Sequence, residues 1–187
     1  QLVPNFGAYR RNYRRVLSHR NALLKRGRAP SLEELFPWNL RLAELGAVIA
    51  RNRAELLKDI QALLPNTYAN ISKSITDVAI RYKHQFSLES YESHMLQTLE
   101  SRRETDLLRG FTSTGPHRED FEITFNNVIA EETASRGETR SAVLSLKIIE
   151  LDLLQRRLDQ KPLLLLDDVF SELDTTRRHA LTQSLVQ

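Results

Sequence analysis

Apolar residues recur at spacings of three and four along residues 9–26, which is the period of an amphipathic helix. The residues expected to share its apolar face are Tyr9, Tyr13, Val16 or Leu17, Arg20 and Leu23 or Leu24. Four arginines fall largely off that face: Arg10, Arg11, Arg14 and Arg15. Gly27 and Pro30 follow, and both residue types favour the end of a helix.

A second helix is predicted to begin after Ser31, because Ser31-Leu32-Glu33-Glu34 has the form of a capping box. Pro37 is expected to kink or restart this helix, and Pro65 is expected to end it. Between the two prolines, apolar residues form a heptad seam that is broken only at Asn52: Trp38, Leu42, Leu45, Ile49, Leu56, Ile60 and Leu63. Together the two helices predict an antiparallel helical hairpin. The hairpin is either an ordinary helix pair on a globular core or an arm on an α/β head, and the narrow seam favours the arm.

The middle of the chain changes its period. Residues 77–85 alternate apolar and polar side chains, which indicates a strand, and residues 88–108 have a helical composition. The apolar face of this third helix is predicted to carry Tyr91, Met95 and Leu99. Residues 121–125 alternate again, and Asn126-Asn127 predicts a turn into a returning strand within residues 128–133.

A tight turn is predicted at Gly115-Pro116, ahead of His117 and Arg118. A single histidine is usually structural. A His-Arg pair exposed on such a turn is somewhat better placed to meet an anion.

Ser135-Arg136-Gly137-Glu138 is predicted to begin a long helix that reaches about Leu158. The apolar face of this helix is expected to include Val143, Leu144, Ile148, Leu151 and Leu154 or Leu158. Serine and glycine at a helix start present free backbone N–H groups to an anion. The alternative is a plain N-cap, and the motif taken alone favours that alternative.

Four consecutive leucines, residues 163–166, have neither a helical nor an alternating period. Bounded by Pro162 and by Asp167-Asp168, they predict a strand buried on both faces, as in an α/β sheet covered by helices. Acids at the exit of such a strand lie where open α/β sheets bind ligands. They hold Mg²⁺ beside nucleotide phosphates, or they end the strand and cap the next helix. Ser171-Glu172-Leu173-Asp174 is expected to turn into a final helix over residues 175–187.

Composition adds limits to this picture. The chain of 187 residues contains no cysteine, which excludes disulfides and thiolate metal sites and is compatible with a reducing cytosol. No apolar run reaches membrane-spanning length, and no secretory signal is evident. Because the chain begins with Gln1, we expect it to be part of a longer protein. Residues 1–64 carry a net charge of +7 and residues 65–187 a net charge of −4. The basic first segment either binds a phosphate backbone or forms a solvated helix face, and charge alone slightly favours the solvated face.

The order of these late motifs resembles the C-terminal half of an ABC-type ATPase head, in the branch that includes SMC-like proteins. Residues 135–138 match the signature motif, residues 163–168 match Walker B, and residues 171–174 match the D-loop. Within that branch, residues 115–120 and 164–174 resemble the RecF family of recombination mediators. Residues 20–25 and 42–46 also resemble the arm of that family, so the resemblance runs from about Tyr9 to the end of the chain.

This resemblance implies an α/β fold: an ABC-type ATPase head, residues 71–187, with an antiparallel helical arm, residues 1–70. It implies that Asp167 holds Mg²⁺ through water and that Asp168 orients or deprotonates the attacking water. Further ATP contacts are implied at the dimer interface for Ser135, Gly137, Glu138, Ser171 and Asp174. It also implies a cytoplasmic, ATP-dependent homodimer that clamps duplex and gapped DNA. This clamp acts with RecR and RecO and helps to load RecA, and the four arginines at 10, 11, 14 and 15 are expected to contact DNA phosphates.

The chain departs from the family pattern in several places. It contains no G-x-x-x-x-G-K-[ST] sequence, so the phosphate-cradling loop is absent and the chain alone is not expected to hydrolyse ATP. Asp168 stands where many ABC proteins have Glu, which favours slow turnover. Arg136 and Glu138 stand where Gly and Gln are common. Two alternatives remain open: a head fragment of another SMC-like ATPase, or a non-enzymatic helical interaction module.

Overall fold

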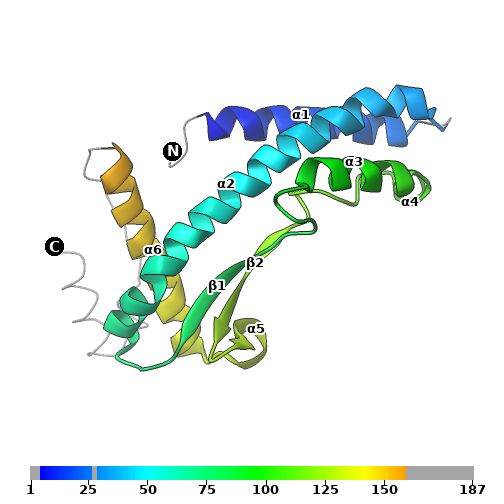
Figure 1. Cartoon of the computed structure of the whole chain (residues 1–187). Coiled ribbons are helices and arrows are strands. Elements are labelled where there is room, and N and C mark those ends of the chain that lie inside the picture. Colours follow the sequence, from blue (N-terminus) through cyan, green and yellow to red (C-terminus); the bar gives the residue numbers. More distant parts are fainter. Residues whose placement is uncertain (1–4, 27–28, 159–187) are drawn as a thin grey trace. The chain divides into compact units, whose positions relative to one another are not determined.

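The computed structural model describes residues 5–26 and 29–158 (Figure 1). Its helices and strands are, in chain order, α1 (Phe6–Leu24), α2 (Leu32–Ser72), β1 (Val78–Lys83), α3 (Tyr91–Ser101), α4 (Arg103–Arg109), β2 (Asp120–Phe125), β3 (Val128–Ile129), α5 (Ala130–Thr133) and α6 (Arg136–Leu158). The strands form one sheet in the order β1-β2-β3. This part of the chain is therefore mostly helical with a small antiparallel sheet. The buried strand predicted at residues 163–166 and the turn after it lie outside the described residues.

The chain divides into two compact units. The helical unit, as we call it, contains residues 5–55 and 82–120, with α1, the first part of α2, α3 and α4. The sheet unit contains residues 56–81 and 121–158, with the rest of α2, most of the sheet, α5 and α6. The predicted division into an arm and a head at residue 70 stays a prediction.

In the helical unit, α1 packs against the first part of α2, and the chain reverses its direction between them (Figure 1). The predicted capping box at Ser31 is confirmed: Ser31 N–H donates to the Glu34 carboxylate at 2.8 Å, and Glu34 N–H donates to Ser31 Oγ at 3.1 Å. Next to this start, the His19 and Trp38 rings stack with centroids 5.0 Å apart. The buried residues of α1 are Tyr13, Arg20 and Leu24, all on the predicted face.

The segment of α2 in this unit is buried over a broad arc, not along a narrow seam. Its buried apolar residues between 42 and 50 are Leu42, Ala43, Leu45, Ala47, Ile49 and Ala50. The breadth arises because two helices, α1 and α3, pack on this segment of α2. Tyr91, Met95 and Leu99 of α3 join the same core, as predicted for one face of that helix. Gly46 permits this approach, since a Cβ there would lie 2.7 Å from the Met95 sulfur.

Pro65 does not end the second helix, contrary to the prediction, and Pro37 does not restart it. Helix α2 continues through both prolines to Ser72. A proline inside a helix removes one hydrogen bond and costs about 3 kcal/mol. The residues around Pro65 offset that cost by packing, because Leu64, Tyr68 and Ile71 are fully buried.

The helix predicted over residues 88–108 is in fact two helices. Arg102 separates α3 from α4, and its N–H donates to Thr98 O at 3.0 Å. Helix α4 ends at Arg109, and the following Gly110 has a left-handed φ of 71°, as is common for glycine after a helix. The break allows Asp106 to enter the interior, where it is fully buried.

The sheet unit has its own core, formed by Leu64, Tyr68, Val78, Ile80, Phe125, Ala142, Ile149 and Leu153. The predicted hairpin is confirmed: Thr124 pairs with Ile129 and Phe125 with Val128 in antiparallel register. Asn126 and Asn127 both have positive φ angles, 49° and 65°, which is typical of a two-residue hairpin turn. The returning strand is shorter than predicted, because α5 follows it directly.

Helix α6 buries its predicted face only in part, with Leu144 buried as predicted. Val143 is 52% exposed, whereas Ser141, Ala142, Ser145 and Ile149 are buried. A hydropathy pattern does not identify the two serines as buried, but their hydroxyls form hydrogen bonds within the helix. Ser141 Oγ donates to Gly137 O at 2.9 Å and Ser145 Oγ to Ser141 O at 2.7 Å. Small, internally bonded side chains therefore form part of the buried face.

Candidate functional site

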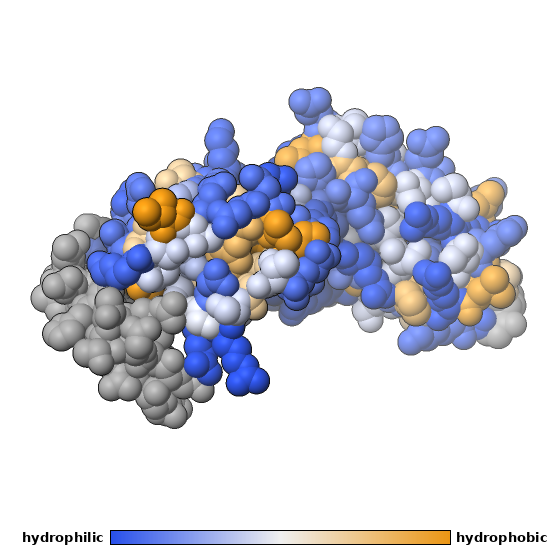
Figure 2. Space-filling view, turned by 90° about the horizontal axis from the view of Figure 1, so that it is seen from below, coloured by the Kyte–Doolittle hydropathy of each residue, from blue (hydrophilic) through white to orange (hydrophobic). Residues whose placement is uncertain are grey.

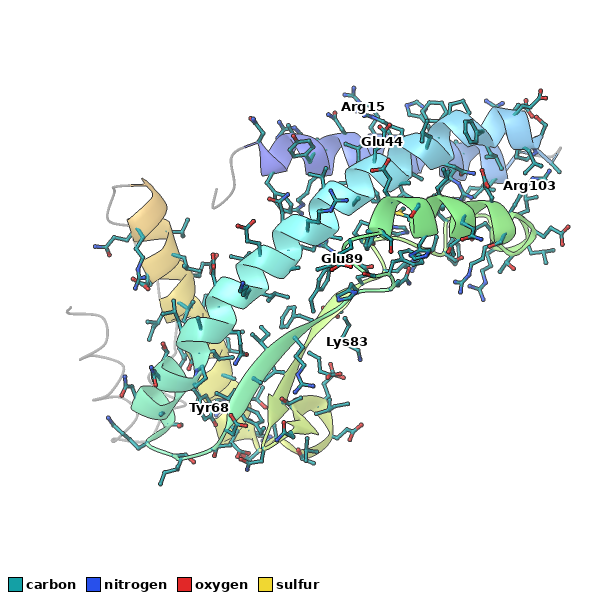
Figure 3. All side chains as sticks on the ribbon, in the orientation of Figure 1. Arg15, Glu44, Tyr68, Lys83, Glu89 and Arg103 are labelled. Carbon is teal, nitrogen blue, oxygen red and sulfur yellow. The ribbon has the colours of Figure 1, made fainter. Side chains whose placement is uncertain are left out.

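Helix α1 carries an exposed basic face. Arg10, Arg11, Arg14 and Arg15 are all exposed and lie away from the buried residues of that helix. Figure 3 shows Arg15 projecting from α1 on the side away from α3. None of the four forms an ion pair with a described residue. Four uncompensated guanidinium groups within six residues repel one another, and a polyanion would relieve this repulsion.

The start of α6 is a capping box built from the predicted signature residues. Ser135 N–H donates to the Glu138 carboxylate at 2.8 Å, and Glu138 N–H donates to Ser135 Oγ at 3.2 Å. Ser135 is exposed, and Gly137 and Glu138 are half-buried. A serine hydroxyl that accepts one hydrogen bond can still donate its own proton to a phosphate oxygen. The box thus fits a helix cap and leaves the hydroxyl proton available, while the Glu138 carboxylate already occupies part of the helix N-terminus.

The remaining predicted ATP and metal residues lie outside the described part of the chain: Asp167, Asp168, Ser171 and Asp174. Within residues 5–26 and 29–158, no group of three or more His, Asp or Glu side chains is arranged to hold a metal ion. In the same residues, no helix has the length and apolar character needed to cross a membrane. The magnesium site at Asp167 stays a prediction.

A buried polar cluster in the helical unit was not predicted. Arg20 is fully buried and forms a 2.8 Å ion pair with Asp106, which is also fully buried. Its guanidinium also donates to Asn39 Oδ1 at 2.7 Å, to Thr112 Oγ1 at 2.8 Å and to Leu99 O at 3.3 Å. Burial lowers the pKa of Arg20, and the hydrogen bond and charge of Asp106 oppose that shift. One sequence signal pointed to this cluster, since an arginine on an apolar helix face requires buried partners.

The cluster anchors the start of the loop over residues 112–119. Thr112 donates to Asn21 Oδ1 through its N–H at 2.8 Å and through its hydroxyl at 2.7 Å. Ser113 N–H donates to the second oxygen of Asp106 at 3.0 Å. Further along, Gln85 Oε1 accepts from Thr114 Oγ1 at 2.7 Å and from Gly115 N–H at 3.1 Å. The loop is therefore fixed by side chains from distant parts of the sequence.

The predicted turn at Gly115 is confirmed, because Arg118 N–H donates to Gly115 O at 2.9 Å. Gly115 has a φ of 118°, and a Cβ there would lie 2.6 Å from Met95 Cε and 2.7 Å from the Tyr13 hydroxyl. Only glycine fits both the backbone conformation and the space. Pro116 is buried after it, and its carbonyl accepts a hydrogen bond from Arg53.

His117 and Arg118 have different environments. His117 Nε2 lies 3.1 Å from Thr112 O, and Nδ1 lies 2.8 Å from the Tyr13 hydroxyl. A carbonyl only accepts, so Nε2 carries the proton and Nδ1 accepts from Tyr13. Burial lowers the pKa of His117, which keeps the ring neutral. Arg118 is exposed, and its guanidinium lies 4.7 Å from the centroid of the Phe111 ring. His117 is therefore structural, and only Arg118 faces solvent as a cation.

Glu119 completes the support of the loop from its other end. Its carboxylate accepts from Tyr91 Oη at 2.7 Å, from Gln85 N–H at 2.8 Å and from the Tyr82 hydroxyl. Burial, with the hydrogen bond to Glu119, raises the pKa of both tyrosines well above their ordinary value. These groups stay protonated, so they act as fixed donors.

The comparisons with known proteins agree on one group of relatives. The chain is 34% identical over 191 residues to the DNA replication and repair protein RecF of Halothermothrix orenii, covering 97% of this chain and 51% of that protein. RecF of Geotalea uraniireducens is 37% identical over 179 residues, covering 93% of this chain and 48% of that protein. A solved structure described as the recombination mediator protein RecF-ATP in the RecFOR pathway matches with a TM-score of 0.86 and 30% identity, covering 97% of this chain and 51% of that one. No protein-family model matches the chain. The chain thus spans about half the length of the curated relatives that it matches.

Proposed function

Because this chain is a RecF homologue that corresponds to about half of a RecF protein, we propose that it is part of an ATP-dependent DNA clamp. The clamp would act in recombinational repair and in the processing of replication gaps. The observation that carries the proposal is the extent of the match: nearly the whole chain aligns with RecF proteins in sequence and with a RecF-ATP structure in fold.

In this proposal, two such proteins clamp ATP between them. Asp167 holds Mg²⁺ through water, and Asp168 orients or deprotonates the attacking water, since phosphoryl transfer depends on positioning and charge neutralisation. Across the interface, Ser135 and Gly137 approach the γ-phosphate of the partner's ATP at the start of α6, with Glu138 beside them. The other residues proposed at the interface are Ser171 and Asp174. The chain contains no Walker A sequence, so ATP hydrolysis needs a lobe that supplies one.

DNA contact is proposed for the basic face of α1. Its four exposed arginines have no acidic partner among the described residues, which supports a role in binding phosphates. In the same proposal, residues 1–70 act as the arm of the clamp and residues 71–187 belong to its head. The proposed partners are duplex and gapped DNA, a second copy of the protein, RecR and RecO, with RecA loaded in the cytoplasm.

The test of DNA contact uses the 187-residue chain and a variant in which Arg10, Arg11, Arg14 and Arg15 are replaced by alanine. We expect weaker binding to duplex DNA of any sequence, measured by fluorescence anisotropy. The plot of log affinity against log salt should become flatter by about 0.9 for each lost phosphate contact. A control variant replaces Lys58, which is an exposed cation of the sheet unit, by alanine. An unchanged salt slope in the four-arginine variant would show that the basic face is only solvated.

A further inference from the structure

A second surface of the helical unit combines cations with an exposed aromatic ring. We call it the Phe111 patch, and its residues are Lys25, Leu108, Arg109, Phe111 and Arg118. Leu108 is 91% exposed and Phe111 is 37% exposed. Figure 2 shows one face of the molecule, on which apolar side chains lie among polar ones, as is ordinary for a protein surface. In the Phe111 patch, an exposed aromatic ring is in direct contact with a cation, Arg118.

Two contacts bring three parts of the sequence together at the patch. Arg109 precedes Gly110 and Phe111 at the end of α4. Lys25, at the end of α1, reaches Gly110: its Cγ would lie 3.5 Å from a Cβ placed there. Arg118 reaches the ring of Phe111 from the tip of the fixed loop, at 4.7 Å from the ring centroid.

Among the described residues, no carboxylate pairs with the cations of the patch. Neither Lys25, Arg109 nor Arg118 forms an ion pair with a described residue. Asp106 pairs with Arg20, and the Glu119 carboxylate accepts hydrogen bonds from two tyrosines. The patch therefore presents three cations that form no ion pair with a described carboxylate.

The loop holds Arg118 in position before any ligand arrives. The turn that carries it is fixed by Gly115, by the His117 hydrogen bonds and by the Glu119 carboxylate. A guanidinium that lies on an aromatic ring keeps its planar shape open for a further planar group or for a phosphate. Little conformational entropy is then lost when a ligand binds.

We propose that the Phe111 patch binds single-stranded nucleic acid, with a base stacking on the Phe111–Arg118 pair and phosphates meeting Lys25 and Arg109. Aromatic rings beside a basic surface are the chemistry by which proteins hold single strands, because unpaired bases can stack on a ring or a guanidinium plane. A duplex hides its bases, so contact to its backbone needs cations alone. The inference rests on the proposed DNA-binding function, and it assigns the single strand to a surface other than the α1 arginines.

The test measures binding of the 187-residue chain to fluorescent oligothymidylate and to a blunt duplex of equal length. Phe111→Leu keeps an apolar side chain but removes the ring, and it should weaken oligothymidylate binding about tenfold with no change in salt slope. Arg109→Ala removes a proposed phosphate contact, so it should weaken oligothymidylate binding and also lower the salt slope by about 0.7, the value for one phosphate contact on a single strand. Both variants should bind the duplex as the unmodified chain does. Lys58→Ala is the matched control for the loss of one exposed cation.

Two results would overturn the inference. The first is unchanged oligothymidylate binding in both variants, which would leave the patch as a protein-docking or purely structural surface. The second is an equal loss on the duplex and on the single strand, which would make the patch a general phosphate contact. The four-arginine variant of α1 reports separately on duplex binding. If the four-arginine variant binds the duplex with unchanged affinity while the patch variants bind oligothymidylate more weakly, the α1 proposal fails and this inference stands.

Discussion

Replacing Asp106 by alanine should destabilise the helical unit by about 3–5 kcal/mol, because it leaves the Arg20 guanidinium buried without its counter-charge. Both side chains are fully buried, and the distance from Arg20 Nη1 to Asp106 Oδ2 is 2.8 Å. The variant also frees Ser113 N–H, which donates to the other carboxylate oxygen at 3.0 Å. Since a domain of this size is stable by only about 5–15 kcal/mol, the predicted loss is a large share of the total.

Urea unfolding followed by fluorescence measures this loss through a probe that lies in the helical unit. The chain has one tryptophan, Trp38, and it stacks on His19 beside the polar cluster. The matched control is Glu44→Gln, which breaks an ion pair with Arg41 in the same unit. That pair is exposed, with 54% and 39% of the two side chains accessible, so its loss should cost less than about 1 kcal/mol.

A double variant tests the cause of the predicted loss. Arg20→Met with Asp106→Leu removes both charges, and apolar replacement of a buried ion pair is often neutral or stabilising. The double variant should therefore cost much less than the sum of Arg20→Met and Asp106→Leu measured singly, although Asn39 and Thr112 lose a partner. A cost below about 1 kcal/mol for Asp106→Ala, or strictly additive costs, would refute the claim that the pair is a buried, coupled unit.

Four further predictions concern the loop and the start of α6. Gly115→Ala should lower the free energy of unfolding in urea by about 1–3 kcal/mol, since its Cβ would overlap Met95 and Tyr13. Gly110→Ala should lower it by less, because a Cβ there meets only the flexible Lys25 side chain. Because burial lowers the pKa of His117, the unfolded chain binds more protons, so stability should fall as the pH drops below about 6.5 toward the folded pKa. His117→Asn should remove that part of the pH dependence, and an unchanged slope would contradict it. Ser135→Ala should cost about 1 kcal/mol through the lost cap. In a protein that joins this chain to a Walker A lobe, Ser135→Arg should prevent ATP-driven dimerisation in sedimentation, and normal dimerisation would reduce the motif to a cap.

Local patterns in the sequence were sufficient for the features that local physics decides. The capping box at Ser31 forms as predicted, Ser135 takes the N-cap position that the sequence held open as one alternative, and the Asn126-Asn127 turn closes the predicted hairpin. Each depends on residues at most four positions apart. The continuation of α2 through Pro65 was missed because the cost of a proline is local, whereas the burial of Leu64, Tyr68 and Ile71 that offsets it depends on the tertiary fold.

Long-range partners were outside the reach of any local pattern. Arg20 could be recognised as a charge on an apolar face, but its partner Asp106 is 86 positions away. Several carboxylates in the sequence could have served, and only the packing of α4 against α1 selects this one. The same packing gives His117 and Arg118 different environments, although the sequence pattern predicts that both are exposed on the turn. The turn at Gly115 directs the imidazole to Tyr13 and the guanidinium to Phe111. The candidate cation of this surface therefore depends on the backbone at Gly115 as well as on the residue types beside it.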